Sequence, residues 1–128
     1  MHATPSRVLI VEDDAATADT YARILRLEGY DVRTALTAEA AFREVDAWPP
    51  DAMIVDLRMP LVDGLAFLRG LRARDDTRHT PVAIATGDYF LDETIPAQIA
   101  ALSATVRFKP LWLEDLTLLV QELLNVPR

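Results

Sequence analysis

Cysteine is absent from the sequence, which excludes both a disulfide framework and a thiolate metal site. No stretch approaches the ~20 apolar residues that a membrane-spanning helix needs. The start of the chain, MHATPSR, is polar and lacks the apolar centre of a signal peptide. The phosphate-binding loops GxxxxGK(S/T) and GxGxxG are missing as well. These absences predict a cytoplasmic protein with no membrane partner and without the phosphate loops of nucleotide-binding proteins.

Clustered positive charge is also lacking. The chain has 13 Lys and Arg against 20 Asp and Glu, for a net charge of −7, and its basic residues are scattered. Because proteins bind nucleic acid mainly through basic patches, no direct contact with nucleic acid is expected. An apolar content of 51% and a charged content of 26% are typical of a globular protein. The 128 residues predict a single domain, 1–128, with an ordered core over about 6–125.

Short apolar runs alternate with helical patterns along the whole chain. The runs predict buried strands at 8–11, 52–55 and 82–86, a short strand near an edge at 31–35 and a short final strand at 105–108. Apolar residues at helical spacing predict helices over about 14–29, 37–48, 64–74, 91–102 and 113–125. Five such units predict an α/β, flavodoxin-like (βα)5 fold, a doubly wound parallel five-stranded sheet with strand order 2-1-3-4-5.

Polar residues follow or end four of these strands. Glu12 and Asp13 follow the first, Asp56 the third and Lys109 the fifth, while Thr86 ends the fourth. Because the carboxyl ends of parallel strands meet at one edge, these side chains are expected to converge. Three neighbouring carboxylates repel one another, and a hard divalent cation such as Mg²⁺ relieves that repulsion. Lysine and threonine beside them predict a cradle for a phosphoryl group, in which an aspartate can act as nucleophile.

Each of these residues alone has a simpler interpretation. Asp56 and Thr86 are also suited to capping loop amides, and Lys109 with Pro110 is also a common helix entry. The two histidines, His2 and His79, have no acidic or histidine partner at catalytic spacing, so neither is predicted to be catalytic. The candidate site therefore depends on the combination and not on any single residue.

Taken together, four segments resemble the receiver domain of two-component response regulators. LIVEDD, DLRMPLVDG, AIATG and RFKP stand in the order of that family and at close to its spacing. The resemblance implies that Asp56 accepts a phosphoryl group from a histidine kinase or phosphotransfer protein. It also implies that Lys109 holds a phosphoryl oxygen and that Thr86 moves toward the phosphoryl group.

The resemblance further implies a Mg²⁺ site. Asp13 and Asp56 would be direct ligands, Glu12 would act mostly through water, and the backbone carbonyl of Arg58 would complete the protein ligands. One feature departs from the family, which usually has an aromatic residue three positions before the lysine, where this chain has Val106. The way in which phosphorylation is read out is therefore expected to differ.

These features predict a phosphoacceptor receiver domain that signals by conformational change and by binding a downstream protein. It would not be an enzyme beyond catalysing its own phosphorylation and slow autodephosphorylation. A weak or phosphorylation-dependent homodimer is left open. Since only three residues follow Asn125, a stand-alone receiver without an effector domain is expected. The alternative is a phosphate-independent interaction module; a hydrolase would need a second acid near Asp56, where Arg58 stands instead.

Overall fold

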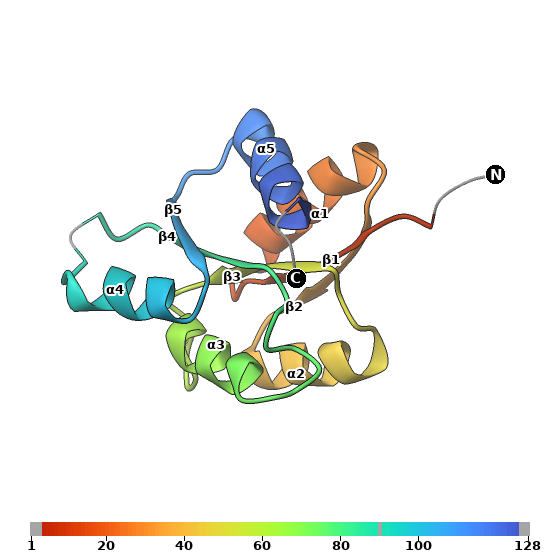
Figure 1. Cartoon of the computed structure of the whole chain (residues 1–128). Coiled ribbons are helices and arrows are strands. Elements are labelled where there is room, and N and C mark those ends of the chain that lie inside the picture. The colour runs from red at the N-terminus through yellow and green to blue at the C-terminus, as the bar shows by residue number, and fades with distance from the viewer. Residues whose placement is uncertain (1–3, 90, 126–128) are drawn as a thin grey trace.

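The computed structural model describes residues 4–89 and 91–125, in which strands and helices alternate from end to end (Figure 1). The elements are β1 (Arg7–Val11), α1 (Ala15–Leu27), β2 (Asp31–Ala35), α2 (Ala38–Ala47), β3 (Ala52–Asp56), α3 (Gly64–Arg72), β4 (Val82–Thr86), α4 (Thr94–Ala101), β5 (Thr105–Phe108) and α5 (Leu113–Leu124). In this part of the chain no helix is long and apolar enough to cross a membrane.

The sheet has the predicted strand order, β2-β1-β3-β4-β5, and every pair of neighbours is parallel. Although β2 separates them in sequence, β1 and β3 are neighbours, with Val11 opposite Val55. On the other side of β3, Asp56 lies opposite Ala85. The residues that follow β1 therefore meet Asp56 at the carboxyl edge of the sheet, where the strand order reverses.

Helices cover both faces of the sheet, which explains why the strands are apolar without alternation. Figure 1 shows α1 and α5 on one face and α2, α3 and α4 on the other. Along β3, Met53 and Val55 pack into the core beneath α2 and α3, while Ala52 and Ile54 pack into the core beneath α1 and α5. The predicted α/β architecture is confirmed.

Local capping signals place most helix ends as expected. The Asp14 carboxylate accepts a hydrogen bond from the Thr17 amide at 3.0 Å, and the Thr37 hydroxyl accepts one from the Ala40 amide at 3.1 Å. Two boundaries differ from the sequence prediction. Helix α3 ends at Arg72 and not at about residue 74, and α4 begins at Thr94 and not at about residue 91.

The late start of α4 has a local cause. The Asp92 carboxylate accepts a hydrogen bond from the Thr94 amide at 2.9 Å, a turn that competes with helix formation. Pro96 is the third residue of the helix. It thus lies in the first turn, as predicted, where its missing amide hydrogen leaves no hydrogen bond unmade.

Candidate functional site

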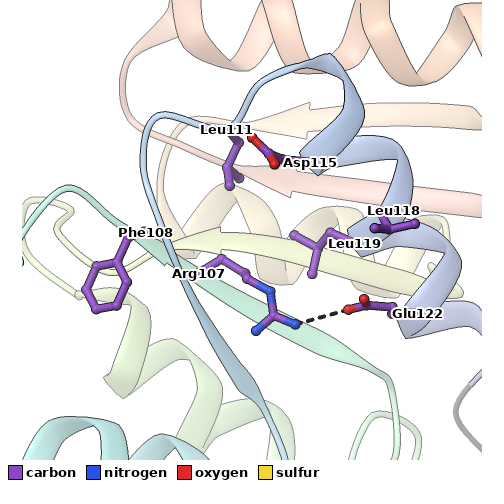
Figure 2. A pocket seen from close by; sticks show the side chains of 7 residues that line it. All are labelled: Arg107, Phe108, Leu111, Asp115, Leu118, Leu119 and Glu122. Carbon is purple, nitrogen blue, oxygen red and sulfur yellow. Dashed lines mark hydrogen bonds and ion pairs between the residues drawn. The ribbon is translucent and has the colours of Figure 1, made fainter.

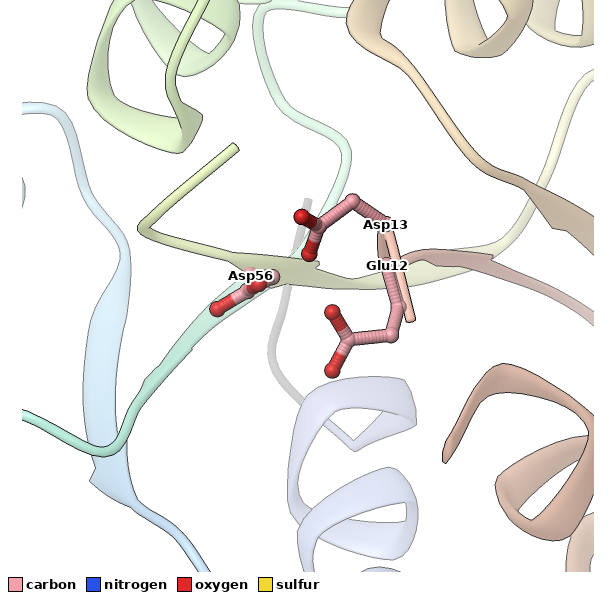
Figure 3. Close-up of side chains that lie close together, drawn as sticks. All are labelled: Glu12, Asp13 and Asp56. Carbon is pink, nitrogen blue, oxygen red and sulfur yellow. The ribbon is translucent and has the colours of Figure 1, made fainter. Parts of the chain in front are cut away.

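Three carboxylates meet where β1 and β3 end. Glu12 and Asp13 follow the last residue of β1, and Asp56 is the last residue of β3. Each offers a carboxylate oxygen, and these oxygens lie within 4.8 Å of one another (Figure 3). Glu12 and Asp56 are buried, at 3% and 7% exposed, whereas Asp13 is exposed. The predicted convergence of these three residues is therefore observed.

Lys109 joins the carboxylates from β5. Its amide donates to the Thr86 carbonyl oxygen at 2.8 Å, which extends the β4–β5 pairing by one residue beyond Phe108. Its ammonium Nζ then lies 2.5 Å from Glu12 Oε1 and 3.3 Å from Asp56 Oδ1. Lys109 thus pairs with both buried acids.

Burial and neighbouring charges shift the pKa values of Glu12 and Lys109. The pKa of Glu12 is raised from its ordinary value of 4.5 to about 7, mainly by burial and also by the hydrogen bond with Asp56, while Lys109 partly opposes both. For Lys109, burial lowers the pKa, but Glu12 and Asp56 outweigh it, so the pKa is raised overall. The ammonium is accordingly held in its charged form between the two acids.

The donor set suits a hard cation. All three candidate ligands offer carboxylate oxygens, which are the groups that Mg²⁺ prefers, and their mutual repulsion is relieved by a divalent charge. Asp13 and Asp56 are suited to contact such an ion directly, and Glu12, which pairs with Lys109, lies beside them. A ligand from the backbone carbonyl of Arg58 stays a prediction.

The loop after Asp56 is anchored tightly against the site. Leu57 and Met59 are buried, so the chain cannot swing away from the end of β3. A Cβ at Gly64 would lie 2.3 Å from the Asp56 carbonyl oxygen, and only glycine permits this approach. The Gly64 amide also donates to the Leu57 carbonyl oxygen at 2.9 Å. Gly64 therefore lets α3 begin directly beside the candidate phosphoacceptor.

Thr86 lies on the other side of the site and is fully buried. Its hydroxyl accepts a hydrogen bond from the Asp88 amide at 3.0 Å. The Asp88 carboxylate in turn pairs with the Arg58 guanidinium at 3.1 Å, across the mouth of the site. These two residues are 30 positions apart, and their opposite charges predict this pair.

Tyr89 is a candidate functional residue that the sequence analysis missed. Its ring stacks on Phe108, with centroids 5.3 Å apart and planes inclined by 18°. Its hydroxyl donates to the backbone carbonyl of Lys109. Val106, where the family usually has its aromatic residue, is half-buried against the core. In the sequence, the sign that Tyr89 could lie near the site is its position three residues after Thr86, in the loop that follows β4.

Two other features lie away from the carboxylates. A pocket of about 220 Å³ between β5 and α5 includes the Arg107–Glu122 ion pair, at 3.0 Å, but none of the three carboxylates (Figure 2). His79 lies in the loop that leads into β4, at the opposite edge of the sheet from Asp56. The absence of a catalytic role for His79 stays a prediction, and His2 lies outside the described residues.

Comparisons with known proteins agree with this arrangement. A sequence model described as the response regulator receiver domain matches residues 8–121. The transcriptional regulatory protein PrrA of Mycobacterium tuberculosis (strain H37Rv) is 34% identical over 122 residues, which is 95% of this chain and 51% of PrrA. The transcriptional regulatory protein TrcR of the same strain is 32% identical over 123 residues, 95% of this chain and 46% of TrcR.

Solved structures are similar over nearly their full length. The chemotaxis protein CheY4 of Vibrio cholerae has a TM-score of 0.87 at 25% identity, covering 94% of this chain and 99% of that chain. A response regulator receiver protein from Pseudomonas putida has a TM-score of 0.86 at 28% identity, with 94% and 99% covered. The chain spans about half the length of the curated relatives named above. The match over residues 8–121 shows that the chain belongs to the response regulator receiver domain family.

Proposed function

We propose that this chain is a phosphoacceptor receiver domain and that Asp56 takes the phosphoryl group. The observation that supports this most directly is the position of Asp56, with Lys109 Nζ 3.3 Å from its Oδ1 and the carboxylates of Glu12 and Asp13 beside it. A carboxylate held at a site of low exposure, next to a cation, is suited to attack phosphorus. The donor would be a histidine kinase or a phosphotransfer protein.

In the proposed transfer, an Asp56 carboxylate oxygen forms a bond to phosphorus while the bond from phosphorus to the donor nitrogen breaks. The donor imidazole keeps the electron pair of that bond and takes up a proton from water. Lys109, already against Asp56, exchanges its contact with Glu12 for a phosphoryl oxygen. A bound Mg²⁺ would neutralise charge on the transferring group. The chain modifies itself in this reaction and turns over no separate substrate.

The experiment that tests this function is intact-mass measurement after incubation with acetyl phosphate and Mg²⁺. One added phosphoryl group, about 80 Da, is the expected result. A chain that gains no mass with acetyl phosphate or any other phosphodonor would instead favour the phosphate-independent interaction module.

A downstream protein and a weak or phosphorylation-dependent homodimer are the proposed outputs. The curated relatives are named transcriptional regulatory proteins, but this chain matches only about half of each. The expectation of no direct contact with nucleic acid, which rests on the net charge of −7, stays a prediction.

Thr86 is expected to transmit the phosphorylated state. Its hydroxyl now accepts from the Asp88 amide, and turning toward a phosphoryl oxygen would break that bond and release the loop that carries Tyr89. Beryllofluoride should shift the amide NMR signals of the segment 87–102. We expect Thr86→Ala to lose most of these shifts and Thr86→Ser, which keeps the hydroxyl, to retain them. Identical shifts in Thr86→Ala would show that Thr86 does not carry the signal.

The Arg58–Asp88 pair is expected to lengthen the life of the phosphorylated state by obstructing attacking water. The side chains are 58% and 37% exposed, so the pair should contribute only ~0.2–1 kcal/mol. Because ~1.4 kcal/mol is tenfold in rate, breaking the pair should speed hydrolysis by no more than several-fold.

The measurement is the decay of the phosphorylated protein in Arg58→Ala, Asp88→Ala and the double variant, analysed as a cycle. Arg23→Ala breaks a more exposed pair with Asp19, within α1 and away from the site, and serves as the control. Faster decay in all three variants, with the double variant no faster than either single one, is expected. Additive effects, or slower decay in the single variants, would argue against a joint obstruction.

A further inference from the structure

Leu61, in the loop between β3 and α3, has a backbone conformation that leucine rarely adopts. Its φ is +68°, in the left-handed region where a Cβ crowds the following carbonyl oxygen. The Val62 amide donates to the Pro60 carbonyl oxygen at 2.9 Å, which closes a γ-turn with Leu61 at its centre. With a positive φ at the central residue, this is the rare and strained form of the turn.

Packing does not offset that strain, because the Leu61 side chain is fully exposed. The residues two positions away on either side, in contrast, are held in place. Met59 is buried, and the Asp63 carboxylate caps α3 by accepting from the Ala66 amide at 2.9 Å. The anchored residues on both sides therefore present the Leu61 side chain outward in a defined position. Strain and apolar exposure at one residue are features that proteins retain at functional sites.

Exposed apolar side chains gather at the edge of the sheet that holds Asp56. Within residues 4–89 and 91–125, only Leu27 and Leu118 among the exposed large hydrophobic side chains lie elsewhere. The others are in the loops after the strands or at the element ends that border them: Leu36, Leu61, Val62, Tyr89, Phe108, Trp112 and Leu113. An apolar rim of this kind is typical of a surface that a partner covers.

We propose that Leu61 is an anchor for the protein phosphodonor, a partner that carries a phosphorylated histidine and covers Leu61 with an apolar surface. This inference rests on the proposed function of Asp56. Asp56 is only 7% exposed, so an imidazole that reaches it must enter past the loops of this edge. The backbone that carries the imidazole then lies against the rim, and Leu61 becomes buried in the contact. A small phosphodonor reaches Asp56 without any such contact.

The test compares Leu61→Asn with Leu27→Asn. Asparagine accepts a positive φ more readily than leucine does, so Leu61→Asn keeps the turn while it removes the apolar side chain. Leu27, 86% exposed, is the last residue of α1 and lies at the opposite edge of the sheet, so it is a matched control. Leu61→Gly provides a second variant that meets the same φ without any Cβ.

Three quantities are measured for each variant: the melting temperature, the rate of phosphorylation by acetyl phosphate and phosphoramidate, and the rate of transfer from a protein donor. The donor is the autophosphorylated histidine kinase of the source genome that transfers fastest to the unaltered chain. Since burial of an exposed leucine strengthens a contact substantially, Leu61→Asn should slow the protein-donor reaction about tenfold. Its rate with the small donors and its melting temperature should not fall, and Leu27→Asn should match the unaltered chain throughout.

Unchanged transfer from the kinase to both Leu61 variants would overturn the proposal. So would an equal loss with the small donors, which would place the effect in the acceptor site itself, or an equal loss in Leu27→Asn. Failure of the proposed function is distinct, because the unaltered chain would then accept no phosphoryl group from any donor.

Discussion

Asp56→Asn is expected to abolish phosphorylation of the chain. The unaltered protein should gain one phosphoryl group, about 80 Da, from acetyl phosphate and Mg²⁺, and the variant should gain none because an amide is a poor nucleophile. Asp56 is the candidate acceptor that Lys109 contacts at 3.3 Å. Chelation of the metal should stop the reaction in the unaltered protein as well, because the transferring group loses its main electrostatic partner. Intact-mass measurement reads both effects directly.

Asp63→Asn is the matched control for this experiment. Asp63 is an exposed residue of the same loop that caps α3, and asparagine caps a helix equally well. The control therefore makes the same chemical change close to the site without disturbing the helix, and it should be phosphorylated normally. A full adduct on Asp56→Asn would exclude Asp56 as the acceptor.

Asp13→Asn is expected to weaken Mg²⁺ binding more than Glu12→Gln does. The Glu12 carboxylate is already held by Lys109 at 2.5 Å, whereas Asp13 is exposed beside Asp56 and suited to contact an ion directly. Loss of an outer-shell partner typically costs 10–100-fold in affinity, and a direct ligand should cost at least as much. Amide NMR titration with Mg²⁺, followed at residues 13 and 56, measures the affinities.

Asp14→Asn is the control for the metal experiment, because it removes a neighbouring charge that caps α1 and lies outside the three-carboxylate cluster. Its affinity should stay close to that of the unaltered protein. Equal affinities of Asp13→Asn and Glu12→Gln would contradict the assigned roles.

The same titration should depend on pH through Glu12. Its pKa is raised to about 7 in the metal-free protein, mainly by burial, so below that pH a cation must displace the proton that Glu12 holds. Mg²⁺ affinity should therefore rise as the pH increases toward 7 and level off above it. Glu12→Gln, which carries no titrating proton, should show a weaker dependence on pH over the same range.

The sequence by itself determined the fold and which polar residues meet at the carboxyl edge of the sheet. Continuous apolar runs such as Val8–Val11 predict strands covered on both faces, and alternation with helical patterns leaves few arrangements of a parallel sheet. Once the sheet is parallel, residues that follow strands must meet at one edge, so Glu12, Asp13, Asp56 and Lys109 were predicted together and are found together. These inferences succeed because periodicity and strand direction are local properties of the chain.

Other contacts and backbone conformations in the loops were decided only by the tertiary structure. The hydrogen bond of Tyr89 to Lys109 joins side chain and backbone across 20 residues, and neither the strand nor the helix pattern constrains the loop that carries Tyr89. The strained turn at Leu61 was likewise not evident, because a leucine gives no sequence signal for a positive φ.

The raised pKa of Glu12 also needed the structure, since it results from burial and from the separations of Glu12, Asp56 and Lys109. Periodicity assigns a residue to a face of an element, but it does not give the path of the loop that follows. Distances between loop side chains depend on that path, and hydrogen bonding and electrostatic interactions change steeply over such distances.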